Sequence, residues 1–303
     1  MQDGSKKAIV AAFGANLGIA VIKFIGFAIT RSTGMLAEAI HSAADTGNQA
    51  LLLVGSNRAK REASATHPFG YGRERYFWSF AVALVLFLLG GLFAIYEGIE
   101  KLRSPHEPEH LPVALAILGA AVVLEGFSFR TALREANHLR GKATMLQFVR
   151  RAKSPELPVV LLEDTGALLG LLIAIIGVIM AKATGNARWD AAGSLAIGIL
   201  LTAIAIFLTI EMKSLLIGEA ADDEQVDLIT EAIKGSPEVV QLIHARTMHV
   251  GPEELLLAAK IHFRDNYTVS ELAEAIDAVE ARVRAAVPIT RLIYLEPDIH
   301  RGP

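Results

Sequence analysis

The sequence predicts a six-helix membrane domain over residues 1–212 and a small α+β domain over residues 213–303. Hydrophobic residues make up 52% of the chain and gather in long blocks, each near the ~20 residues that a helix needs to cross a bilayer. The composition becomes more polar after residue 212, and from Glu219 onwards the chain holds 16 acidic and 8 basic residues. An apolar, basic part therefore precedes a polar, acidic one.

Two function classes are disfavoured by composition alone. The chain contains no cysteine, which excludes a disulfide framework and a soft thiolate metal site. No basic patch stands out, so nucleic acid is not an expected partner.

Six apolar spans follow one another in the first domain. They cover about residues 8–30, 34–57, 76–99, 111–130, 158–182 and 189–211. Lysine and arginine concentrate in the loops after the second and fourth spans, which predicts that both chain ends are cytoplasmic. The basic start before the first span resembles a signal peptide, but the span is too long for one and is expected to be retained. The absence of a transit peptide favours a bacterial inner membrane.

The second domain reads as helix, two strands, helix and strand. Asp222 with Gln225, and Thr268 with Glu271, have the spacing of capping boxes at the starts of the two helices. Strand-like runs lie near 239–249 and 255–264, and a last strand covers Arg291–Leu295. This order predicts a two-layer α+β domain.

Ionisable residues inside the spans need a reason, because each costs roughly 2.5–3.5 kcal/mol on insertion scales. His41 and Asp45 in span two are four residues apart and share a helix face, so they can bind one metal ion. In span five, Glu163 and Asp164 point about 100° apart on a helix. Asp164 is the expected third ligand, and Glu163 is either a fourth ligand or a group that positions the ligands.

Other polar residues in the spans have simpler interpretations, such as hydrogen bonding to a neighbouring helix. Glu97 and Asp190 are interpreted as packing groups. Lys23 is expected to snorkel to the interface or to pair with Glu38. Glu125 has two open interpretations, as a packing partner or as part of a proton path.

Four motifs together resemble the cation diffusion facilitator family. They are HSAAD at 41–45, HPFGYGRER at 67–75, GGLFAIYEGIEKL at 90–102 and LLEDTGALLG at 161–170, and the last two are similar to the branch that includes zinc transporter nine. The resemblance implies a homodimer that exchanges Zn²⁺ for protons by alternating access, with a ferredoxin-like cytoplasmic domain. It also implies a transport site at His41, Asp45 and Asp164.

The sequence departs from the family pattern at three places. Where many relatives have a histidine one turn before the span-five aspartate, this chain has Val160, and Glu163 is the nearest substitute. In the loop before span three, His67 is present but the second histidine position is Tyr71. The last strand reads IYLEPD without a histidine, so no strong metal site is expected in the tail.

The sequence therefore predicts a proton-coupled exporter of a divalent cation, with Zn²⁺ as the first choice. A transporter for Mn²⁺, Fe²⁺ or Co²⁺ is the nearest alternative, because nitrogen and oxygen ligands suit all of these ions. A membrane metal sensor that binds without transporting is a second alternative. An enzyme is not expected, since no nucleophile lies near the proposed site and no HExxH motif occurs.

Overall fold

The computed structural model describes residues 3–30, 33–104 and 111–299, and the side chains of residues 3–6, 30, 33–38, 40–41 and 111 lie outside this description. The chain forms two compact units. One comprises Met1–Arg58 and Glu74–Lys213, and the other comprises Ala59–Arg73 and Ser214–Pro303. The predicted division at residues 212 and 213 stays a prediction, and the second unit also includes the loop between the second and third spans.

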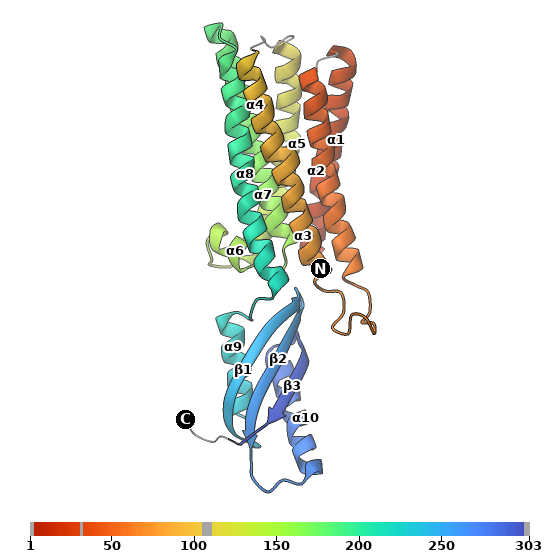
Figure 1. Ribbon diagram of the computed structural model, residues 1–303, viewed down its shortest axis with the longest axis vertical. Helices are drawn as coiled ribbons and strands as arrows, with labels where there is room; N and C mark the ends of the chain where they lie inside the picture. Colours follow the sequence, from red (N-terminus) through yellow and green to blue (C-terminus); the bar gives the residue numbers. More distant parts are fainter. Residues whose placement is uncertain (1–2, 31–32, 105–110, 300–303) are drawn as a thin grey trace. The chain divides into compact units, whose positions relative to one another are not determined.

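The first unit is built of helices (Figure 1). They are α1 (Asp3–Thr30), α2 (Thr33–Arg58), α3 (Glu74–Val85), η1 (Leu86–Leu92), α4 (Phe93–Arg103), α5 (Leu111–Leu139), α6 (Met145–Arg151), α7 (Glu156–Thr184) and α8 (Arg188–Ile217). Each of the six apolar spans falls on a helix, with α3, η1 and α4 running on as one. The predicted membrane all-α class is confirmed.

Among the described residues, five helical stretches are long and apolar enough to cross a membrane. They are Lys7–Ile29, Glu74–Arg103, Pro112–Leu139, Glu156–Thr184 and Arg188–Ile217. The sixth predicted span, α2, has 26 residues and is long enough, but its apolar run is broken by Asp45, Asn48 and Gln49. Of the six predicted spans, the one on α2, which carries the HSAAD motif, is thus the one that does not meet this measure among the described residues.

Two details of these helices were not among the predictions from the sequence. The segment η1 is a π-helical turn inside the third span, and α6 is a short helix between α5 and α7. Thr144 caps α6 by accepting from the backbone N–H of Gln147, whose side chain accepts in return from the Thr144 N–H. This capping box starts a helix of only seven residues, too short to appear as an apolar span.

Glycines let α4 and α8 pack closely. A Cβ added at Gly98 would lie 2.7 Å from Cγ of Leu195, and one at Gly198 would lie 2.6 Å from Cγ1 of Ile95. Real Cβ atoms do not approach so closely, so a larger residue at either position would force the helices apart. The side chains of Ile95 and Leu195 fill the spaces that the glycines leave.

The second unit contains α9 (Asp223–Lys234), β1 (Val239–Gly251), β2 (Glu254–Phe263), α10 (Val269–Ala286) and β3 (Thr290–Pro297). The sheet order is β1-β2-β3, with β1 antiparallel and β3 parallel to the central β2. Alternate residues of β2 are buried against α9 and α10, which lie behind the strands in Figure 1. The predicted α+β domain, in the predicted element order, is confirmed.

One of the two predicted capping boxes forms completely, and the other forms only in part. Thr268 and Glu271 form a complete capping box at α10. Asp222 accepts from the backbone N–H of Gln225 and so caps α9, but Oε1 of Gln225 makes no hydrogen bond within the described residues. Only half of that predicted box therefore forms.

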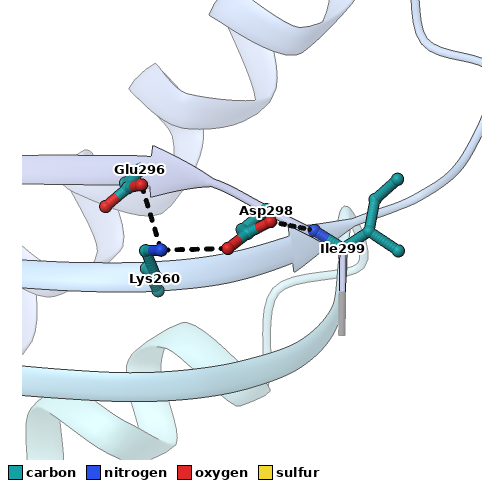
Figure 2. Close-up of polar contacts among 4 residues, drawn as sticks. All are labelled: Lys260, Glu296, Asp298 and Ile299. Carbon is teal, nitrogen blue, oxygen red and sulfur yellow. Dashed lines mark hydrogen bonds and ion pairs between the residues drawn. The ribbon is translucent and has the colours of Figure 1, made fainter. Parts of the chain in front are cut away.

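A charged cluster joins β2 to the end of β3 (Figure 2). The Nζ atom of Lys260 lies 3.0 Å from Oδ2 of Asp298 and 3.2 Å from Oε1 of Glu296. Hydrogen bonds to Asp298 and then Glu296 raise the pKa of Lys260 above its ordinary value. Both acidic residues come from the IYLEPD stretch, so a lysine of this chain neutralises them.

The HPFGYGRER loop packs on the turn between β1 and β2. A Cβ added at Gly72 would lie 2.8 Å from the carbonyl oxygen of Val250 and 2.9 Å from Cα of Gly251, so the two backbones touch. Next to this contact, Nη2 of Arg73 lies 3.3 Å from Sδ of Met248. The second glycine of this motif, Gly72, is explained by this close backbone approach.

Candidate functional site: a charged cavity in the membrane unit

A cavity of about 80 Å³ lies among the membrane helices. Its walls are mostly apolar side chains of α1, α5, α7 and α8. Four ionisable residues also line it, namely Lys23, Asp45, Glu125 and Glu163. Charges at membrane depth are costly, and their convergence on one cavity marks it as the candidate site.

Asp164 is the most unusual of the predicted site residues. Its side chain is fully buried on α7, and Ser128 of α5 donates a 2.7 Å hydrogen bond to its Oδ2. The other oxygen, Oδ1, has no hydrogen-bond partner among the described residues. Buried polar atoms are nearly always satisfied, so an incomplete buried carboxylate is suited to receive a cation.

Glu163 is held quite differently. Nδ2 of Asn48 donates to its Oε1 and Nε2 of Gln49 donates to its Oε2, each at 2.7 Å. Both carboxylate oxygens are thus used to tie α7 to α2. Of the two roles predicted for Glu163, these bonds favour a group that positions the ligands, and its role as a ligand stays a prediction.

The two α2 residues of the predicted site differ in how far they can be placed. Asp45 lines the cavity and is half-buried, and Ser42 one turn earlier lines it as well. His41 belongs to α2, but its side chain lies outside the described residues, as does that of Glu38. Among the residues whose side chains are described, no three histidine or carboxylate groups are gathered closely enough to hold a metal ion. The four-residue ligand set therefore stays a prediction.

Glu125 belongs to the cavity, although the sequence left its role open. It is 5% exposed on α5, and its Oε2 makes no hydrogen bond within the described part of the chain. The signal was present in the sequence as a carboxylate in the middle of an apolar span. Nothing in the sequence showed that it would face the same cavity as Asp45.

Lys23 departs from its predicted snorkelling role. Its side chain is only 5% exposed and lines the cavity from α1. A snorkelling lysine reaches along its own helix to the interface, whereas this one ends among charged neighbours inside the helix bundle.

Other charges at membrane depth are compensated away from the cavity. Nζ of Lys101 lies 3.1 Å from Oδ2 of Asp190 on α8, so Asp190 contacts a neighbouring helix as predicted. The same atom lies 3.2 Å from Oε1 of Glu97 one turn earlier on α4, so Glu97 is paired within its own helix. At the starts of α3 and α7, Arg75 and Glu156 form a buried ion pair, with Nη2 2.8 Å from Oε2. These groups are therefore structural.

Comparison with known proteins agrees with this architecture. The family model for the cation efflux transmembrane domain matches residues 9–217. Metal tolerance protein C4 of Arabidopsis thaliana is 31% identical over 269 residues, which is 88% of this chain and 58% of the plant protein. The mitochondrial proton-coupled zinc antiporter SLC30A9 of Mus musculus is 32% identical over 265 residues, or 86% of this chain and 46% of the mouse protein.

A bacterial relative matches over nearly its whole length. The magnetosome protein MamB of Magnetospira sp. is 25% identical over 296 residues, 96% of this chain and 92% of that protein. By contrast, the chain spans about half the length of the plant and mouse relatives. The family match covers most of the chain and includes α2 with its HSAAD motif, so the chain belongs to the cation diffusion facilitator family, in its zinc transporter nine-like branch.

Proposed function

We propose that this protein exports a divalent metal cation, with Zn²⁺ as the first choice, across a membrane in exchange for protons. The observation that carries the proposal is the buried carboxylate of Asp164, whose Oδ1 lacks a hydrogen-bond partner among the described residues. A relative named as a proton-coupled zinc antiporter and the cation efflux family match support it.

The proposed ligands are His41, Asp45 and Asp164, with Glu163 as a fourth ligand or as the group that positions them. Imidazole nitrogen and carboxylate oxygen suit Zn²⁺. Ser128 and the two amides on α2 orient the adjacent carboxylates of α7, since ligand side chains work best when neighbouring hydrogen bonds fix them.

Proton exchange follows from the chemistry of these ligands. A divalent cation binds deprotonated carboxylate and neutral imidazole, so its binding expels protons. After the helices rearrange to face the other side, protons there compete the ion off the same groups. His41 is the proposed main proton exchanger, because an unperturbed imidazole titrates near ~6.5.

The proposal extends to the setting of the protein. Lysine and arginine after spans two and four support cytoplasmic chain ends, and we place the protein in a bacterial inner membrane. The acidic unit would then be the cytoplasmic domain from residue 213 onwards, and the active assembly a homodimer.

The transported ion has one serious alternative. The proposed site is rich in oxygen, with three carboxylates against one imidazole, and Val160 stands where many relatives have a second histidine. Oxygen-rich sites suit Mn²⁺, Fe²⁺ and Co²⁺ as well as Zn²⁺. A transporter for one of these ions therefore remains the second candidate.

The test is metal uptake into sealed proteoliposomes that hold a pH gradient, with indicators for Zn²⁺ and Mn²⁺ inside. Wild type should show gradient-dependent uptake, and both Asp45→Ala and Asp164→Ala should abolish it. Glu97→Gln is the matched control, because Glu97 is also a membrane carboxylate but pairs with Lys101 outside the cavity. Saturable binding without flux would instead favour a sensor, and the faster ion would identify the substrate.

A further inference from the structure

Lys23 is a basic side chain that lines the candidate transport cavity. It is 5% exposed, and the same cavity is lined by the carboxylates of Asp45, Glu125 and Glu163. An ammonium group at this depth is retained only when opposite charges offset its loss of water. The cavity therefore contains an immobile cation as well as the anions that would receive a mobile one.

The position of Lys23 differs from that of two other cations in the helical unit. Arg75 and Lys101 contact their carboxylates in structural pairs that do not line the cavity. Lys23 lines the cavity itself, and so does Glu125, whose Oε2 has no hydrogen-bond partner among the described residues. A divalent ion entering the cavity meets both groups.

We propose that Lys23 is a tethered counter-cation that sets the affinity of this cavity for divalent ions, with Glu125 as its balancing anion. The proposal rests on the transport function proposed above. Without metal, the ammonium offsets part of the carboxylate charge. With metal bound, it repels the ion through a medium of low dielectric constant, which keeps affinity low enough for release.

The charge balance makes opposite predictions for the two residues. Lys23→Gln removes the repulsion, and the dissociation constant for Zn²⁺ or Mn²⁺ should fall at least about tenfold, equivalent to about 1.4 kcal/mol. Glu125→Gln removes an attraction, and the dissociation constant should rise by a similar factor. The double variant should bind within about threefold of wild type, because the two opposite changes in charge cancel.

The experiment is calorimetric titration of the purified full-length chain in lipid nanodiscs with each metal ion alone. Lys23→Arg keeps the charge and should bind like wild type, which a purely steric role of lysine would not give. Lys101→Gln is the matched control, since it removes a membrane cation outside the cavity and should leave the dissociation constant unchanged. In proteoliposomes, Lys23→Gln should lower both KM and turnover, because the ion binds tightly and leaves slowly.

Unchanged or weaker binding by Lys23→Gln would overturn the proposal. If that variant does not fold, a dissociation constant for Glu125→Gln equal to wild type would overturn it instead. Asp164→Asn separates this failure from failure of the transport function. Binding lost in Asp164→Asn but unaltered in Lys23→Gln refutes only the counter-cation, whereas wild type that binds neither metal refutes both.

Discussion

Two buried carboxylates of the helical unit, Asp164 and Glu125, differ from three carboxylates of the second unit (the tail) in how their oxygens are bonded. In the tail, Glu296 and Asp298 share Lys260, and Glu271 closes a capping box. In the membrane unit, Asp164 and Glu125 each keep one buried oxygen without a hydrogen-bond partner among the described residues. The tail carboxylates have partners, whereas two buried ones each lack a partner for one oxygen. The free-energy cost of an unsatisfied polar atom is greatest when the atom is buried. The three tail carboxylates thus stabilise the fold, whereas the two buried oxygens are the ones for which we propose a metal ion as partner.

The largest effect is expected when the buried carboxylate of Asp164 loses its charge. Asp164→Asn preserves size and can still accept from Ser128, so the helices should pack as before. Metal uptake into proteoliposomes should fall to the level of empty vesicles, because a neutral amide does not replace an anionic ligand. Full uptake by this variant, with normal thermal unfolding, would show that the comparison is wrong.

Loss of an ion pair around a buried carboxylate should lower the stability of the fold rather than abolish metal uptake. Arg75→Gln leaves Glu156 buried without its cation, and the free energy of unfolding should fall by about 3–5 kcal/mol. Denaturant unfolding in detergent measures this loss. Arg151→Gln, at an exposed position on α6, is the control and should change stability little. Equal effects of the two substitutions would contradict a structural role for the pair.

Substitution of Glu163 tests whether this carboxylate is a metal ligand or a group that positions the ligands. Glu163→Ala leaves the amides of Asn48 and Gln49 without acceptors, at a cost of about 1–3 kcal/mol each. If Glu163 only positions α2, metal affinity should drop less than in Asp164→Asn. Titration of both variants with Zn²⁺ decides this, and equal losses of affinity would make Glu163 a ligand.

The smallest effect is expected in the tail cluster. The pKa of Lys260 is raised by Asp298 and Glu296, so its stabilising contribution is fully present below the unfolded pKa of ~10.4 and is lost as pH rises through the folded pKa. The stability difference between wild type and Lys260→Gln should therefore vanish at high pH. Thermal unfolding between pH 7 and pH 12 measures it. A change in metal uptake at neutral pH would contradict a purely structural role.

Elements and helix faces were predictable from local pattern, whereas the bonding of individual oxygens was not. Apolar blocks predicted the six helical spans, and the Thr268 and Glu271 spacing predicted a capping box that forms. Glu163 and Asp164 are neighbours in sequence with similar chemistry. What separates them is contact with α2 on one side and with Ser128 on the other, and such contacts arise only when distant helices pack.

That Lys23 lines a cavity could not be predicted from the sequence, for the same reason. Helix periodicity shows which face carries a side chain, but not whether that face meets lipid or a cavity. The π-helical turn η1 was also unpredicted, because its residues are as apolar as the rest of the span. The parallel pairing of β2 with β3 likewise depends on how α10 returns the chain across the sheet.

The glycine contacts between α4 and α8 have a mechanical consequence for any alternating movement. Ile95 and Leu195 fill the gaps at Gly198 and Gly98, so neither helix can slide along the other without driving a side chain into backbone. We therefore expect α4 and α8 to move together. Because packed helices shift between discrete arrangements rather than deform continuously, the alternating movement proposed above would displace whole helices relative to this pair. The charged residues that line the cavity lie on α1, α2, α5 and α7, so these are the helices whose movement the proposed mechanism would require.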